Sequence, residues 1–117
     1  MSRIAPFPFK ATTEIKPYTF VNVDLEAGTC TPSTNLETTK GITVGDRTPS
    51  AGGLISVHSA KNVTESFLVR ANGTIAKGAT VASDANGLAV TTASGVFTAL
   101  EAGVAGQIIN VISTEAF

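Results

Sequence analysis

Short β-branched runs separated by turn residues occupy the chain from Leu54 onward, and this pattern constrains the fold most. The runs expected as strands are 54–59, 66–71, 79–83, 88–92, 96–100 and 107–112. Between them, Asn72-Gly73 and the segment 84–87 are sequences that tolerate the positive φ angles of tight turns. A helical apolar period does not last two turns anywhere, except weakly over 97–105, where Gly103 and Gly106 bound it. We therefore predict an all-β fold, a small β-barrel or sandwich.

The first fifty residues differ because they contain all five prolines, at positions 6, 8, 17, 32 and 49. Proline lacks the N–H that a sheet ladder needs, so this part predicts neither a continuous sheet nor a helix. Within it, 18–23 forms one strand-like run, and 27–53 is rich in turn formers that indicate long loops. We predict an extended arm and loop over residues 1–40 and a β-barrel-like domain over 41–117. The arm either folds back onto its own core or reaches a neighbouring subunit.

The composition predicts a protein partner. Charged residues make up 15% of the chain and hydrophobic residues 43%, whereas about 25% of residues are charged in average soluble domains. No window approaches the roughly 18 consecutive apolar residues of a membrane span, so we expect a protein surface, not a membrane, to cover the apolar surplus. The net charge is −1 and the eight basic residues are scattered, which argues against nucleic acid as a ligand.

The start of the chain has no apolar segment typical of a secretory signal, so we expect synthesis in a reducing cytoplasm. The single cysteine, Cys30, agrees with this expectation because it has no intramolecular partner for a disulfide.

Residues suited to catalysis or metal binding are few. His58 is the only histidine, and the spacing of the nearest acids, Asp46 and Glu65, does not predict that they lie beside it. Cys30 and the serines near His58 lack a nucleophile motif. One histidine, one cysteine and scattered carboxylates do not form the ligand sets that zinc or calcium prefer. The glycine pair in 41–46 and that in 103–106 lack a phosphate-loop lysine and indicate turns. We predict a protein that is not an enzyme and holds no cofactor or metal.

Three segments near the C-terminus together resemble a known family. The run 75–90, with Lys77-Gly78 and Asp84 to Gly87, is followed by the small-residue segment 99–106 and by Ile108-Ile-Asn-Val111. This pattern resembles the small capsid decoration (cement) proteins of tailed bacteriophages. The resemblance covers about a third of the chain, and this sequence departs from it in its longer start rich in Pro and Phe.

The resemblance implies a virion protein made in the host cytoplasm that binds the outer surface of the assembled head. It would bridge subunits of the major capsid protein and so stabilise the shell, as a homo-oligomer, with a trimer favoured over a dimer. Because aromatic and large apolar groups supply most of the binding energy at interfaces, we expect contacts to the capsid or a neighbouring subunit from Ile4, Phe7, Phe9, Tyr18 and Phe20.

Two alternatives stay open. One is another virion component, such as a head-fibre base. The other is a carbohydrate-binding β module, which is disfavoured because the chain has no Trp and only one Tyr.

Overall fold

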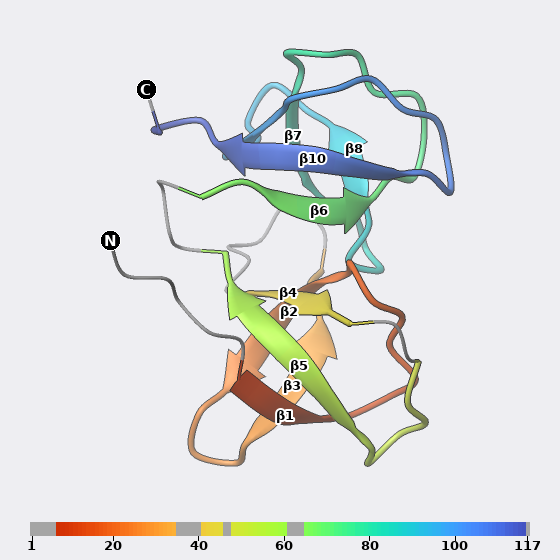
Figure 1. The fold of residues 1–117 in the computed structure, drawn as a ribbon, viewed down its shortest axis with the longest axis vertical. Coiled ribbons are helices and arrows are strands. Elements are labelled where there is room, and N and C mark those ends of the chain that lie inside the picture. Colours follow the sequence, from red (N-terminus) through yellow and green to blue (C-terminus); the bar gives the residue numbers. More distant parts are fainter. Residues whose placement is uncertain (1–6, 35–40, 46–47, 61–64, 117) are drawn as a thin grey trace.

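The computed structural model describes residues 7–34, 41–45, 48–60 and 65–116, and within these ranges it contains ten strands and no helix (Figure 1). The all-β prediction is confirmed. The strands are β1 (Phe7–Ala11), β2 (Phe20–Asp24), β3 (Thr29–Pro32), β4 (Gly41–Val44), β5 (Leu54–Ser59), β6 (Phe67–Arg70), β7 (Thr80–Ser83), β8 (Ala89–Thr91), β9 (Phe97–Ala99) and β10 (Ile108–Ser113). The described ranges therefore offer no helix of a length and apolarity that would cross a membrane.

The strands form two units stacked along the long axis of the molecule (Figure 1). The first, here called the N-terminal half, is a closed barrel of order β1-β3-β2-β4-β5, in which β1 pairs with β5 to complete the ring. The second, the C-terminal half, is a five-stranded sheet of order β6-β10-β9-β7-β8. A single parallel bridge between Ala71 and Ala89 joins the two ends of this sheet, so it curls into a nearly closed barrel.

The two halves repeat one topology. In the first, β1 runs parallel to β3 and antiparallel to β5, while β2 joins β3 to β4 and β4 pairs with β5. In the second half, β6, β7, β8, β9 and β10 correspond in order to β1, β2, β3, β4 and β5. Each of them pairs with the strands that correspond to its equivalent's partners. The registers agree as well. Equivalent residues, each pair 60 positions apart, include Phe7 and Phe67, Lys10 and Arg70, Ala11 and Ala71, Val21 and Val81, and Asp24 and Asp84.

Hydrogen bonds outside the strands repeat in the same way. The N–H of Thr12 donates to the carbonyl of Cys30, and the N–H of Asn72 donates to that of Ala89. Tyr18 is the one non-glycine residue with positive φ in the described ranges, at 64°. Its equivalent is Gly78, whose φ is 88°, so the repeat explains why the chain adopts a left-handed conformation at this tyrosine.

Each barrel is filled by side chains from equivalent positions. The interior of the first holds six buried residues: Ala11, Ile15, Val21, Cys30, Ile55 and Val57. The interior of the second holds their six equivalents: Ala71, Ile75, Val81, Ala89, Ile109 and Val111. Burial of each large aliphatic side chain contributes roughly 1.5–3 kcal/mol to stability, so the same inward positions stabilise both halves.

An aromatic cluster joins the halves. Phe20 of the N-terminal half stacks on Phe97 of the C-terminal half, with ring centroids 5.2 Å apart, and meets Phe67 edge to face at 6.3 Å. Ile42 and Ala60 of the first half belong to the same buried cluster. Aromatic pairs in these geometries contribute about 0.5–1.5 kcal/mol beyond burial. The two halves therefore share one continuous core at their contact.

The structure corrects the prediction of an extended arm over residues 1–40. Within it, 7–11, 20–24 and 29–32 form β1, β2 and β3 of the closed barrel. Pro8 lies in β1 and Pro32 ends β3, so two prolines are accommodated inside strands of the ladder. The predicted loops over 27–53 likewise contain β3 and β4, and the glycine pair expected as a turn begins β4 at Gly41.

The strands predicted from Leu54 onward are confirmed, with ends that shift by at most one residue. The weak helical period over 97–105 is instead strand β9 followed by turns.

Candidate interaction site

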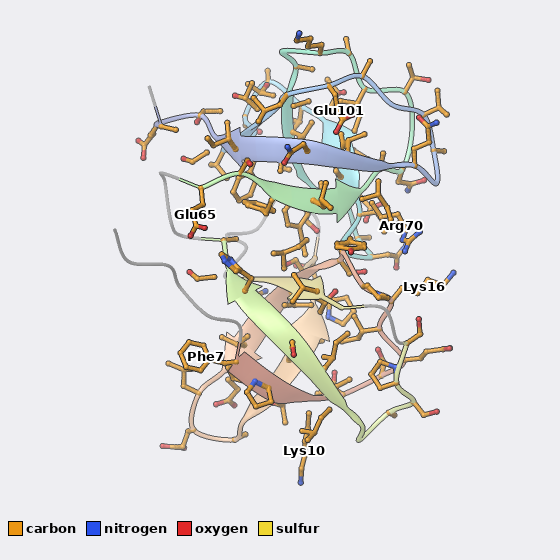
Figure 2. The ribbon with its side chains drawn as sticks, viewed as in Figure 1. Phe7, Lys10, Lys16, Glu65, Arg70 and Glu101 are labelled. Atoms are coloured by element: carbon orange, nitrogen blue, oxygen red, sulfur yellow. The ribbon has the colours of Figure 1, made fainter. Side chains whose placement is uncertain are left out.

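An apolar groove lies on the N-terminal half, beside the start of β1 and the end of β5. It has a volume of about 200 Å³ and is lined by Phe7, Phe9, Val23, Leu25, Val57 and Ser59. Phe7 is 61% exposed and Leu25 is 80% exposed, and Phe7 lies at the outer edge of the lower barrel (Figure 2). Large apolar side chains exposed together typically mark a surface for a protein partner.

The repeat explains why this groove is open. At the equivalent end of the C-terminal half, Phe97 fills the barrel and Phe20 of the other half stacks on it. Gly41 occupies the position of Phe97 in the first barrel, according to the strand registers. The side chain of Val57 has closed in on this glycine, because a Cβ there would lie 2.5 Å from Val57 Cγ1. The Phe7 end therefore lacks both rings that seal its counterpart.

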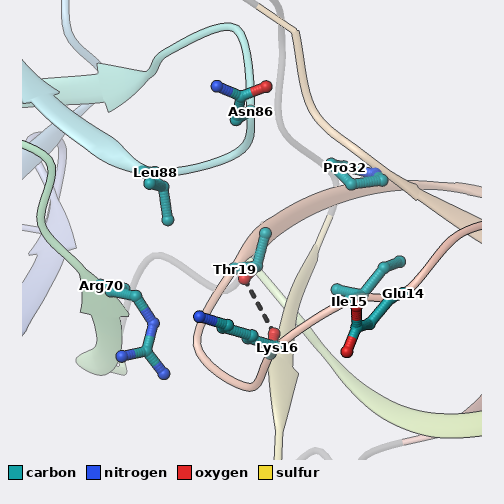
Figure 3. A pocket seen from close by; sticks show the side chains of 8 residues that line it. All are labelled: Glu14, Ile15, Lys16, Thr19, Pro32, Arg70, Asn86 and Leu88. Carbon is teal, nitrogen blue, oxygen red and sulfur yellow. Dashed lines mark hydrogen bonds between the residues drawn. The ribbon is translucent and has the colours of Figure 1, made fainter. Parts of the chain in front are cut away.

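A second depression, of about 240 Å³, lies on the seam between the halves (Figure 3). Its lining residues are Glu14, Ile15, Lys16, Thr19, Pro32, Arg70, Asn86 and Leu88. Arg70 donates from its backbone N–H to the Tyr18 carbonyl at 2.8 Å and from Nη2 to the Pro17 carbonyl at 3.3 Å. The hydroxyl of Thr19 donates to the Lys16 carbonyl at 2.8 Å. These bonds hold the Pro17–Thr19 turn against β6. The residues around the depression therefore serve mainly to connect the two halves.

The residues expected to contact a partner fall into different environments. Phe7 and the half-buried Phe9 lie together in the apolar groove. Tyr18 is half-buried at the seam, and Ile4 lies outside the described residues. Phe20 is fully buried between the halves. It is therefore a core residue that a partner of the folded chain does not reach, contrary to its prediction as a contact. Leu25 and Val57, which sequence reasoning missed, complete the groove.

The reactive side chains are held in structural roles. Nε2 of His58 lies 3.9 Å from the carboxylate of Glu65, and Nδ1 lies 3.0 Å from the Ser59 carbonyl. Glu65 therefore lies near His58, a proximity that the sequence spacing did not predict. Cys30 is buried inside the first barrel, and this burial raises the pKa of its thiol. In the part of the chain that the structure describes, no three His, Cys, Asp or Glu side chains gather as metal ligands.

Comparison with known proteins gives a fold relationship. No family model matches the chain, and no curated protein matches it. Among solved structures, the chain is similar to the crystal structure of the head fiber gp8.5 N base in bacteriophage phi29, with a TM-score of 0.76 and 16% sequence identity. The similarity covers 96% of this chain and 95% of the other. Because it extends over both halves, the two proteins share the complete two-barrel fold.

Proposed function

We propose that this chain is a structural component of a bacteriophage virion that attaches to the outside of the head. The observation that carries the proposal is the shared fold, from end to end, with the base of a phage head fibre. The resemblance of 75–111 to capsid decoration proteins, noted from the sequence, supports the same class of protein. Both likenesses point to a protein of the phage head.

The surface of the chain suits this role. Eight large apolar side chains are exposed among the described residues, which suits binding to a protein partner, and the net charge of −1 gives little attraction to nucleic acid. The partner we propose is the major capsid protein. Binding to assembled heads would stabilise them by mass action, because the protein binds the assembled state in preference to free subunits. In this role the chain acts by binding alone, without a catalytic step.

Co-sedimentation tests the proposal. Purified protein is mixed with phage heads that lack it, and with heads of an unrelated phage as a control. We expect the protein to pellet with its own heads, to saturate at a fixed number of copies per head, and to remain in the supernatant with the control heads. Failure to saturate, or equal binding to both kinds of head, would contradict the proposal.

The proposal has two forms, a cement protein and a fibre base, which differ in how much the bound protein stabilises the head. If the chain acts as a cement protein that bridges capsid subunits, we expect saturating protein to raise markedly the temperature at which filled heads release their DNA. If it acts as a fibre base, we expect that temperature to change little. DNA release followed by a dye that is excluded from intact heads, with and without saturating protein, separates the two. The shared fold with a fibre base favours attachment, and the sequence resemblance favours stabilisation.

A further inference from the structure

The repeated fold provides one contact between the halves and leaves the matching face of each half without a partner in the chain. Within the chain, the N-terminal half covers Phe67 of β6, which is 9% exposed. The equivalent residue, Phe7 of β1, is 61% exposed. Strand β1 lies at one end of the long axis while β6 lies at the contact between the halves (Figure 1). The first barrel therefore presents to the outside the face that the second barrel buries.

The C-terminal half shows the complementary difference. The N-terminal half contacts its neighbour through Phe20, Ile42 and Val44. Their equivalents by strand register are Thr80, Thr98 and Leu100. Leu100 is 39% exposed, and Thr80 and Thr98 are partly exposed. Figure 2 shows Glu101, the residue after Leu100, in the upper half and Phe7 in the lower half.

We propose that copies of this chain associate head to tail. The groove at Phe7 (Phe7, Phe9 and Leu25, here the Phe7 face) packs against Thr80, Thr98 and Leu100 of the next copy (the Leu100 face). The arrangement repeats between copies the contact that the two halves make within one chain. An interface between two different faces either closes into a ring or continues as a filament.

The contact between copies is looser than the contact within the chain. Inside the chain, the N–H of Arg70 donates across the seam to Tyr18, whereas the equivalent N–H of Lys10 already donates to Gly28 of its own barrel. Thr80 also offers less apolar surface than Phe20, its counterpart. The association therefore rests on apolar side chains, and we expect it to be reversible and to depend on concentration.

Light scattering on two single variants tests each face. Phe7→Asp places a charge in the groove, and Leu100→Asp places one on the opposite face. We expect the wild type to have a mass that is a multiple of 11.9 kDa, and each variant to have the monomer mass at the same concentration. Leu54→Asp is the matched control: Leu54 is 59% exposed on the strand next to β1, and its equivalent Ile108 is also exposed. Circular dichroism confirms that all three variants are folded.

Mixing the variants distinguishes a head-to-tail contact from a symmetric one. Phe7→Asp chains keep an intact Leu100 face, and Leu100→Asp chains keep an intact Phe7 face. An equimolar mixture of the two monomers should therefore form a one-to-one pair and stop there. If two Phe7 faces met each other instead, Leu100→Asp would remain oligomeric by itself and the mixture would gain nothing, which would overturn the proposal.

This test is independent of capsid binding. A wild type that is monomeric at every concentration overturns the self-association. If that monomer still pellets with heads, the proposed virion function stands without this inference. If an oligomer forms but ignores heads, the inference stands and the proposed function fails.

Discussion

At the residue scale, Gly87 is the position where the contact between halves depends most on the absence of a side chain. Its φ is +82°, and a Cβ there would lie 2.5 Å from the Phe20 carbonyl oxygen and 2.6 Å from Thr19 Cγ2. Gly87→Ala should therefore destabilise the protein by more than the roughly 1–2 kcal/mol that a left-handed alanine costs. Gly106→Ala is the control, because Gly106 has a φ of +89° and open space around it. Urea unfolding gives both values, and equal losses would contradict the account.

The two equivalent phenylalanines give a second prediction at this scale. Phe67→Ala should cost about 3–5 kcal/mol, as expected for a buried aromatic residue, because its ring packs against Phe20 and Phe97. Phe7→Ala should cost less than about 1 kcal/mol of monomer stability, since most of its surface is already in water. Chemical denaturation, at a concentration where the wild type is monomeric, measures the loss of unfolding free energy in both variants. Similar losses for both would show that Phe7 is covered in the monomer.

At the element scale, each half contains the same aspartate turn between its second and third strands. Asp24 accepts hydrogen bonds from the N–H groups of Glu26 and Ala27. Asp84 accepts from the N–H groups of Asn86 and Leu88 and also from the side chain of Asn72. Asp84 is 9% exposed, whereas Asp24 is exposed. We expect Asp84→Ala to cost about 2–3 kcal/mol and Asp24→Ala about 1 kcal/mol, because Asp84 accepts three part-buried hydrogen bonds whereas the two that Asp24 accepts are exposed. Thermal unfolding of both variants checks the order, and a reversed order would contradict it.

The strands that the sequence predicted and those it did not differ in their local signals. Strands β5 to β10 consist of β-branched runs bounded by turn residues such as Asn72-Gly73, so short-range pattern was sufficient. Strands β1 and β3 were hidden by Pro8 and Pro32, and β4 is only Gly41–Val44. Their pairing is long-range, since β1 closes the barrel on β5. A signal did exist in the constant spacing from Phe7, Ala11 and Asp24 to Phe67, Ala71 and Asp84, because an internal repeat indicates a repeated unit.

The candidate site was predictable only in part, for a related reason. Aromatic composition selected Phe7 and Phe9 as partner contacts, and the structure places them together in one surface groove, where their contact with a partner stays a prediction. The same criterion selected Phe20, which is fully buried, because a sequence read one residue at a time does not show which aromatic ring a neighbouring barrel covers. Only the comparison of the two halves shows that Phe7 and Phe67 occupy one position in two environments.

At the scale of the whole molecule, the shared core predicts that the two halves unfold together. Phe20 and Ile42 of the first half belong to the same buried cluster as Phe97 of the second, so unfolding one half exposes core of the other. Two thiols at equivalent positions test this: the natural Cys30, and a cysteine placed at Ala89 in a Cys30→Ala background. Both positions are buried, so a thiol reagent should react with each only after unfolding. We expect the same urea midpoint for labelling at both positions, and the same midpoint by circular dichroism, as cooperative unfolding requires. An earlier midpoint for labelling at one position would show that the halves are independent domains held in contact, and that the aromatic cluster contributes little to either.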